Sequence, residues 1–459
     1  MTHEAPSVTP STGLPPSTGG APSTEVEGRS RVPRRWAAGL RLMTPSGRAR
    51  VPVAWALYDM ANTVFSFAVV SVAMGLWLTR PERLGPTEGQ VALGLVVALS
   101  VLINALVSPI LGALSDRAGR RLPFLLFFTA LCVVPTVFIG PSPAIVGLAL
   151  FALANFAFQA ALIYYDALLP LVSRPESRGR LSGIGVAVGY LGTITVGVLL
   201  VTLDVSLEGT FVVAGALFAA LAVPIFVVVR EGRSVARRDS TGVSWAQLRH
   251  TIRAAREIPG LLRFLVARFF YTDPINTVIV VMAVFAVQAI GLSESAARAF
   301  LLFLAVVAVV ASLGWGVLVD RLGPRRTLLL VLASWCVGLA IVGLSLSPAA
   351  FVVAGAVLGS GLGGVQVADR VFLLRLAPAD RVGEFFGLYG LIGKLSAVTG
   401  PLLYGVIVGV LLEPLGRTAY QLGILSLLIL MVIGIWLVRS VSDRPSVPVT
   451  AGVAPVGAN

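Results

Sequence analysis

Charged residues are scarce in this chain, and that scarcity excludes a water-soluble globular protein. Only 12% of the 459 residues are charged, whereas 56% are hydrophobic. A soluble domain carries charge on about a quarter of its residues. The composition therefore predicts a polytopic membrane protein embedded in the lipid bilayer.

Residues for metal, redox and nucleotide chemistry are also scarce. His3 and His250 are too scattered for a metal site, and Cys132 and Cys336 lie in apolar runs that favour packing over a disulfide. There is no nucleophile–base set and no Walker motif, so we expect no enzyme, no cofactor and no ATP-driven transport. The net charge of +13 is spread between apolar runs, which indicates topology signals and argues against a nucleic-acid partner.

Apolar runs of roughly 20 residues follow one another from Val51 onward. They predict an all-α membrane protein with 12 transmembrane helices, arranged as two six-helix bundles related by pseudo-symmetry. We place the helices near residues 52–78, 89–114, 122–140, 144–169, 181–203, 209–229, 261–287, 296–319, 327–346, 349–375, 385–411 and 418–438.

The loops between these runs alternate between arginine-rich and uncharged. The positive-inside rule puts the arginine-rich loops and both termini in the cytoplasm, with the chain in the cytoplasmic membrane. We predict a disordered, basic cytoplasmic tail over 1–50, bundles over 51–229 and 261–440, a cytoplasmic linker over 230–260 and a disordered tail over 441–459. Within the linker, the segment from Trp245 to Arg256 has the pattern of an interfacial amphipathic helix.

The two predicted bundles share an internal repeat. The segment Gly112-Ala-Leu-Ser-Asp-Arg-Ala-Gly-Arg-Arg returns as Gly316-Val-Leu-Val-Asp-Arg-Leu-Gly-Pro-Arg-Arg. Asp320 follows Asp116 by 204 positions, and Cys336 follows Cys132 by the same 204. The repeat runs in the same direction in both halves, which predicts two bundles related by an axis along the membrane normal.

The pattern Gly-x-x-x-Asp-Arg-x-Gly-Arg-Arg resembles the loop signature of the major facilitator superfamily. Its glycine permits close helix approach, its Asp can accept hydrogen bonds from the start of a neighbouring helix, and its arginines can pair across a seam. Such contacts would close a cytoplasmic gate, with Glu384 as a partner; the alternative is that the arginines only set topology. The gating candidates are Gly112, Asp116, Arg117, Gly119, Arg120, Arg121, Asp320, Arg321, Asp369, Arg370 and Glu384.

Further motifs make the chain similar to the vacuole-effluxer-like branch of that superfamily, which includes autophagy-related amino-acid effluxers. They are Trp55-Ala-Leu-Tyr-Asp-Met-Ala-Asn62, Tyr164-Tyr-Asp-Ala-Leu-Leu-Pro170, Gly183-Ile-Gly-Val-Ala-Val-Gly189 and Glu384-Phe-Phe-Gly-Leu-Tyr389, and the similarity covers about residues 51 to 438. The resemblance implies a multispanning transporter, with amino acids as one class of substrate. It also implies that the first, fourth, seventh and tenth helices line the cavity.

Ionisable residues inside apolar helices are costly and therefore mark candidate sites. Asp59 can bind a cation, a substrate ammonium or a coupling proton, or can be held in a fixed ion pair. Lys394 is the only lysine, and it can hold a substrate carboxylate or neutralise Asp59; Arg268 can bind substrate or simply snorkel. The substrate- or proton-binding candidates are Asp59, Asn62, Asp273, Asn276, Lys394, Arg268, Tyr165 and Gln366.

These features predict a secondary transporter of a small polar or zwitterionic solute, which works as a monomer by alternating access and is coupled to protons. Two alternatives stay open: an exporter of drugs or metabolites with the same fold, and a membrane sensor or scaffold that moves no solute. A channel is disfavoured because the sequence contains no filter-like segment.

Overall fold

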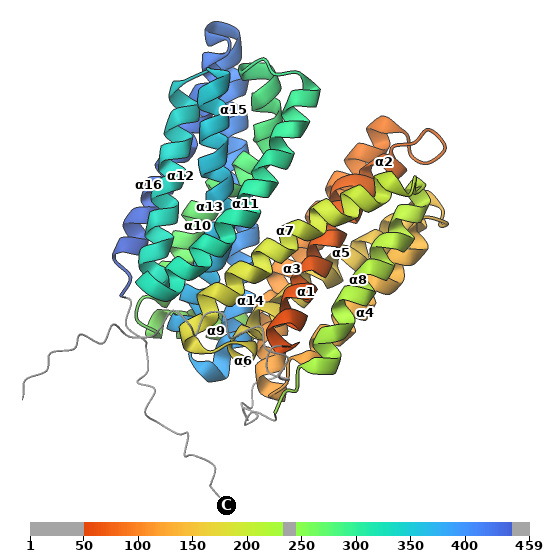
Figure 1. Cartoon of the computed structure of the whole chain (residues 1–459), viewed down its shortest axis with the longest axis vertical. Helices are drawn as coiled ribbons and strands as arrows, with labels where there is room; N and C mark the ends of the chain where they lie inside the picture. The colour runs from red at the N-terminus through yellow and green to blue at the C-terminus, as the bar shows by residue number, and fades with distance from the viewer. Residues whose placement is uncertain (1–49, 233–244, 443–459) are drawn as a thin grey trace, which may run out of the picture. The chain divides into compact units, whose positions relative to one another are not determined.

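The computed structural model describes residues 50–232 and 245–442, and within these ranges every regular element is a helix. Twelve of the helical segments are long and apolar enough to cross a membrane, as predicted (Figure 1). The tails predicted over 1–50 and 441–459 lie almost entirely outside the described residues, as do residues 233–244 of the predicted linker.

The first bundle contains six spans. The first span consists of α1 (Arg50–Phe65), the π-helix η2 (Ser66–Ala73) and α2 (Met74–Leu78). The others are α3 (Pro86–Ala118), α4 (Leu122–Ile139), α5 (Ala144–Ala167), α7 (Arg178–Thr202) and α8 (Leu207–Val228), with the short α6 (Leu169–Val172) and η3 (Pro175–Ser177) between α5 and α7.

The second bundle repeats this order after the linker helix α9 (Trp245–Glu257). Its spans are α10 (Leu261–Val284) with η4 (Phe285–Ala289), α11 (Glu294–Leu322), α12 (Pro324–Leu344), α13 (Pro348–Leu376), α14 (Val382–Leu395) with α15 (Thr399–Leu415), and α16 (Thr418–Arg439). The short η5 (Ala379–Arg381) precedes α14. The helix predictions agree with these bounds to within a few residues.

The eleventh predicted helix is interrupted, which the sequence prediction missed. α14 ends at Leu395 and α15 begins at Thr399. Pro401 is the local cause, because its ring nitrogen cannot donate to the carbonyl four residues earlier and its fixed φ suits the first turn of a new helix. The break therefore lies inside the membrane-spanning segment and leaves backbone groups there in need of partners.

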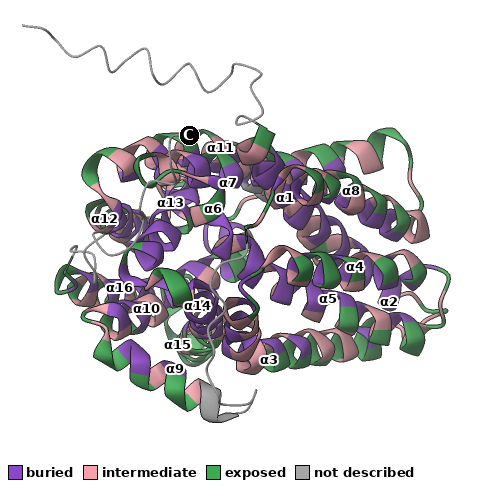
Figure 2. Ribbon diagram, turned by 90° about the horizontal axis from the view of Figure 1, so that it is seen from below, coloured by how far each residue is buried: buried purple, intermediate pink, exposed green. Residues whose placement is uncertain are grey.

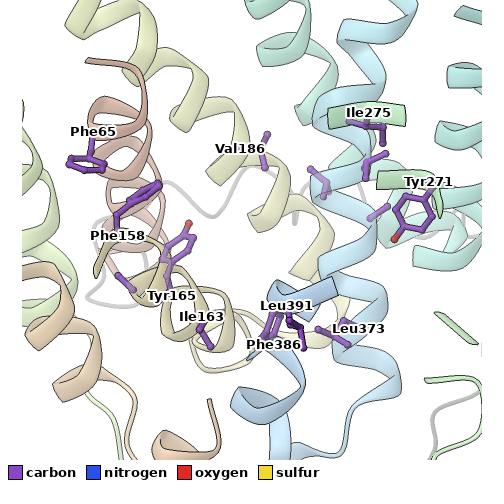
Figure 3. Packing of buried hydrophobic residues seen from close by; sticks show 14 of the residues in the cluster. Phe65, Phe158, Ile163, Tyr165, Val186, Tyr271, Ile275, Leu373, Phe386 and Leu391 are labelled. Atoms are coloured by element: carbon purple, nitrogen blue, oxygen red, sulfur yellow. The ribbon is translucent and has the colours of Figure 1, made fainter. Parts of the chain in front are cut away.

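Aromatic side chains form the core of the first bundle next to α1. The rings of Trp55 and Tyr165 stack with centroids 4.6 Å apart, and Tyr58 stacks on the same Tyr165 ring at 5.2 Å. Phe65 and Phe158 pack one level further along (Figure 3). Tyr165 was predicted to bind substrate or protons; it is completely buried between rings, and its role as a ligand stays a prediction.

The linker helix α9 packs on helices of both bundles. Its residues Thr251, Ala254 and Ala255 are buried, and it contacts α3, α10 and α14. In the view from below, α9 lies beside these helices at the edge of the molecule (Figure 2). The amphipathic helix is therefore present, and its apolar face meets protein.

Candidate functional site: charged residues between the two bundles

The repeated loop motif joins the two bundles at their arginine-rich ends. The Asp116 carboxylate, near the end of α3, accepts hydrogen bonds from the backbone N–H groups of Gly383 (3.0 Å) and Glu384 (2.7 Å) at the start of α14. An anion is stabilised at this position because the first N–H groups of a helix have no partner within the helix. Arg121 also contacts Asp116, at 3.2 Å.

The second copy of the motif makes the matching contact. Asp320, near the end of α11, accepts hydrogen bonds from the N–H groups of Gly179 (2.8 Å) and Arg180 (3.1 Å) at the start of α7. The Arg180 guanidinium adds an ion pair at 2.9 Å. Two carboxylates, one from each bundle, thus bind the first turn of a helix in the opposite bundle.

Glycines make this approach possible. A Cβ atom at Gly112 would overlap the carbonyl oxygen of Gly383, and one at Gly383 would lie 2.6 Å from the Gly112 carbonyl oxygen. Gly119 matters for a different reason, because its φ of 62° places it in the left-handed region that ends α3. Arg120 is exposed, whereas Arg121 donates to the Ala167 carbonyl at 2.9 Å. Whether these residues gate transport stays a prediction.

A salt bridge also joins the two bundles near the end of α5. The Nε atom of Arg370 on α13 lies 3.2 Å from Oδ1 of Asp166 on α5. The Arg370 guanidinium also lies 5.5 Å from the ring centroid of Trp55 and 5.8 Å from that of Tyr165. Arg370 therefore meets a carboxylate and two ring faces of the opposite bundle.

The neighbouring carboxylate, Asp369, is held within its own bundle. Arg268 on α10 forms an ion pair with it, and the Tyr389 hydroxyl donates to its Oδ1 at 2.8 Å. The Arg268 guanidinium lies 3.4 Å from the centroid of the Tyr389 ring. Arg268 is nearly buried and paired, so the structure does not place it snorkelling to the interface.

Asp59 and Asp273 occupy matching positions but have different partners. The Asp59 carboxylate lies against Gly185 and Gly189 of α7, whereas Asp273 lies against Gly400, which follows Gly189 by 211 positions. Because α7 is continuous at Gly185 and Gly189, its N–H groups form hydrogen bonds within the helix and do not donate to Asp59. At the break before α15, the Gly400 N–H is free and donates to Oδ1 of Asp273 at 2.8 Å.

As a result, Asp59 lacks the partner that its repeat mate has. No ion pair within 4.0 Å joins Asp59 to any residue in the described ranges; Arg370 is the cation whose charge acts on it most. One turn further along α1, the side-chain amide of Asn62 is buried without a hydrogen-bond partner in the described part of the chain. Asn276, the matching residue on α10, is half-buried.

Lys394 and Gln366 reach across to the first bundle. The Lys394 ammonium, near the end of α14, donates to Oδ1 of Asn104 on α3. Asn104 is buried and also accepts from Ser108 at 3.0 Å. Gln366 donates to the Tyr190 hydroxyl at 3.3 Å. Lys394 has no ion pair with any carboxylate of residues 50–232 or 245–442, so its predicted pairing with Asp59 does not occur in this structure.

Comparison with known proteins identifies the family. Residues 91–446 match the family model described as "Vacuole effluxer Atg22 like". The chain belongs to this family. It is 25% identical to an uncharacterized MFS-type transporter, YxiO, of Bacillus subtilis (86% of this chain, 95% of that protein), and 23% identical to autophagy-related protein 22 of Coccidioides immitis (73% and 70%).

Solved structures share the fold of this Atg22-like chain. The human organic anion transporter MFSD10 aligns with a TM-score of 0.67 at 14% identity, over 86% of this chain and all of that one. A bacterial homologue of the iron transporter ferroportin aligns with a TM-score of 0.64 at 16% identity, over 86% and 98%. The protein is therefore a multi-pass membrane transporter with the major facilitator fold.

Sequence reasoning understated several residues of this Atg22-like site. Asp166 entered the sequence analysis only within the motif Tyr164-Tyr-Asp-Ala-Leu-Leu-Pro170, and neither Asn104 nor a binding role for Tyr389 was anticipated. A signal for Asp166 was present: Asp369 follows it by 203 positions, close to the repeat offset. Asn104 gave no such signal, because the repeat puts Ala308 at the matching position.

The Asp273 contact gives a first prediction that separates a helix cap from a ligand site. Asp273→Asn keeps an oxygen that can accept from the Gly400 N–H, whereas Asp273→Ala removes it. If Asp273 is a cap, the Asn variant keeps transport within about twofold of wild type and the Ala variant loses about 1 kcal/mol of stability. Counterflow and thermal unfolding of the purified variants measure both. Equal loss of transport in both variants would instead make the carboxylate charge essential.

Proposed function

We propose that this Atg22-like transporter carries a small zwitterionic solute of the amino-acid type by alternating access. The observation that carries the proposal is a pair of opposite charges, Asp59 on α1 and Lys394 on α14, neither of which forms an ion pair within the described residues. A charge inside a membrane-spanning bundle costs at least ~2.5 kcal/mol unless something compensates it. A solute with an ammonium and a carboxylate supplies both missing charges.

The neighbouring groups suit these two roles. Asp59 lies against the glycines Gly185 and Gly189, and an added Cβ atom at Gly185 would lie only 3.1 Å from its carboxylate oxygen. Lys394 meets a neutral amide, Asn104, so a substrate carboxylate can join the ammonium without displacing a fixed anion. The positive charge of Arg370 acts on Asp59, but Arg370 forms its ion pair with Asp166. The Asp166 carboxylate offsets this charge, which weakens the repulsion between Arg370 and a substrate ammonium at Asp59.

Proton coupling and membrane location belong to the same proposal. Among Asp59, Asp166 and Asp369, the last two have arginine partners, so Asp59 is the carboxylate available to carry a proton when no substrate ammonium is bound. The arginine-rich ends face the cytoplasm of the cytoplasmic membrane, by the positive-inside rule. The contacts of Asp116 and Asp320 then correspond to a state closed on the cytoplasmic side.

Counterflow in proteoliposomes tests the proposal. Vesicles that contain the purified protein are loaded with a panel of amino acids, with and without a pH gradient. We expect exchange of at least one amino acid, and a drop of more than about tenfold in Asp59→Asn and Lys394→Met, since a lost charge-assisted contact is worth about 1.5–3 kcal/mol. The matched control is Arg417→Gln, an exposed arginine at the start of α16.

The possible outcomes separate the alternatives. Normal transport in both Asp59→Asn and Lys394→Met would show that the site lies elsewhere. Loss of the pH effect in Asp59→Asn alone would assign the proton to Asp59. Transport of organic anions or hydrophobic compounds with no amino-acid exchange would favour the drug or metabolite exporter, and no transport of any compound would favour a sensor.

A further inference from the structure

The linker helix α9 is attached to the place where the two bundles meet. It contacts α3 of the first bundle and α10 and α14 of the second. The Thr251 hydroxyl donates to the Glu384 carboxylate at 2.5 Å, and the N–H group of the same Glu384 donates to Asp116. If α9 moves away from the protein, the hydrogen bond from Thr251 to Glu384 breaks. Glu384 is also the residue whose N–H group binds Asp116.

The opposite face of α9 is basic and exposed. Arg249, Arg253 and Arg256 follow one another at helical spacings of four and three residues, which puts them on one side of the helix. All three are exposed, and none forms an ion pair with a carboxylate in the described ranges. His250 is exposed beside them, and Glu257 is the only acidic residue of α9.

The position of α9, next to the start of a membrane-spanning helix, allows this basic face to reach the membrane surface. Only three residues separate the end of α9 at Glu257 from the start of the membrane-spanning α10 at Leu261. α9 lies at the edge of the molecule in the view along the bundles (Figure 2). A basic helix at this place meets lipid headgroups, and arginines bind phosphate oxygens in a bidentate manner.

We propose that α9 binds anionic phospholipid headgroups through Arg249, Arg253 and Arg256 and thereby holds the α3–α14 contact closed. The headgroup keeps α9 on the membrane surface, where Thr251 reaches Glu384. Because α9 contacts both α3 and α14, these two helices cannot separate unless α9 loses its contact with one of them. Lipid that holds α9 in place therefore also stabilises the closed contact between α3 and α14. The competing explanation is that the arginines only set topology during insertion, which predicts no effect of lipid on the folded protein.

Hydrogen–deuterium exchange in nanodiscs tests this proposal without any transport assay. The full chain is placed in nanodiscs of phosphatidylcholine alone or of phosphatidylcholine and phosphatidylglycerol in equal parts. We expect amide exchange in residues 248–257 and 382–390 to slow by at least about threefold in the anionic nanodiscs, because local opening becomes rarer. High salt should remove the difference, since it screens exposed charges.

Three variants separate the steps. Arg249→Gln/Arg253→Gln/Arg256→Gln should lose the lipid effect in both segments, whereas the matching triple lysine variant should keep most of it. Thr251→Val keeps the basic face and removes the hydroxyl, so it should keep the effect in residues 248–257 and lose it in 382–390. Arg417→Gln, exposed on another helix, should behave like wild type.

Other results would overturn the proposal. Equal exchange of the wild-type protein in both nanodiscs would show that α9 does not sense lipid charge. Slowing in phosphatidylcholine nanodiscs on addition of soluble inorganic phosphate would identify a free anion as the ligand in place of lipid. Because no solute is involved, failure of amino-acid counterflow would leave these results untouched.

Discussion

Replacing Arg370 by Met is expected to abolish counterflow and to destabilise the protein. The change leaves Asp166 without its ion-pair partner and removes the cation that acts on Asp59. Loss of one partner from a buried ion pair costs about 3–5 kcal/mol, more than removal of both partners together. Thermal unfolding in detergent measures the stability, and proteoliposome counterflow measures transport.

A double variant separates stability from mechanism. In Arg370→Met/Asp166→Asn both charges of the pair are removed, so no buried carboxylate remains without its partner. Most of the lost stability should therefore return. Transport should remain low, because the ionic contact between the bundles is still absent and Asp59 still lacks a nearby cation. A single Arg370→Met variant that unfolds and transports like wild type would refute the role assigned to this salt bridge.

The helices could be predicted from the sequence because each has to satisfy its own backbone in lipid. An apolar run of about 20 residues has few alternatives to a spanning helix. The break at Ser396 was missed for a related reason: it lies in an equally apolar run, and it depends on Asp273, 127 positions from Gly400, to accept the Gly400 N–H. Apolar periodicity carries no information about such a distant partner.

The candidate site was predictable as a set of residues but not as a set of pairs. The sequence identifies Asp59, Arg268, Lys394 and Asp369 because each is an ionisable group in an apolar run. Which carboxylate meets which cation depends on the rotation and tilt of helices in different bundles, and a shift of one residue on a helix turns a side chain by about 100°. Asp369 and Arg370 show this: they are adjacent in the chain and bind partners in different bundles.

The divergence of Asp59 and Asp273 gives the repeat a functional meaning. Both halves keep a carboxylate on the first helix beside a glycine on the fifth helix. Only the second half breaks that fifth helix and uses the carboxylate as a cap. The first half keeps its carboxylate beside a continuous helix without such a cap contact, which is why we place the proposed site at Asp59 and not at Asp273.

Gly112→Ala is expected to stop transport through a single added methyl group. The new Cβ atom would overlap the Gly383 carbonyl oxygen, and backbone cannot move aside as a flexible side chain can. The substitution raises helix propensity, so folding itself should not suffer. The Asp116 contacts to Gly383 and Glu384 would be lost with the close approach, and the arginine-rich ends could no longer close.

Gly94→Ala is the matched control on the same helix. Gly94 has open space around it, so it receives the same methyl group and the same gain in helix propensity without an overlap. Counterflow should be normal in Gly94→Ala and reduced by more than about tenfold in Gly112→Ala. A tenfold reduction corresponds to a destabilisation of the closed state by about 1.4 kcal/mol.

Spin labels show whether the loss comes from the gate. Ala118 and Ala379 are exposed near the end of α3 and the start of α14, and both can be changed to Cys in a chain with Cys132→Ala and Cys336→Ala. The distance between the labels should lengthen in Gly112→Ala and stay unchanged in Gly94→Ala.

Because alternating access needs both closed states, a transporter that cannot close its arginine-rich end binds solute from that side but does not carry it across. Normal counterflow or an unchanged distance in Gly112→Ala would show that close glycine packing is not required for closure.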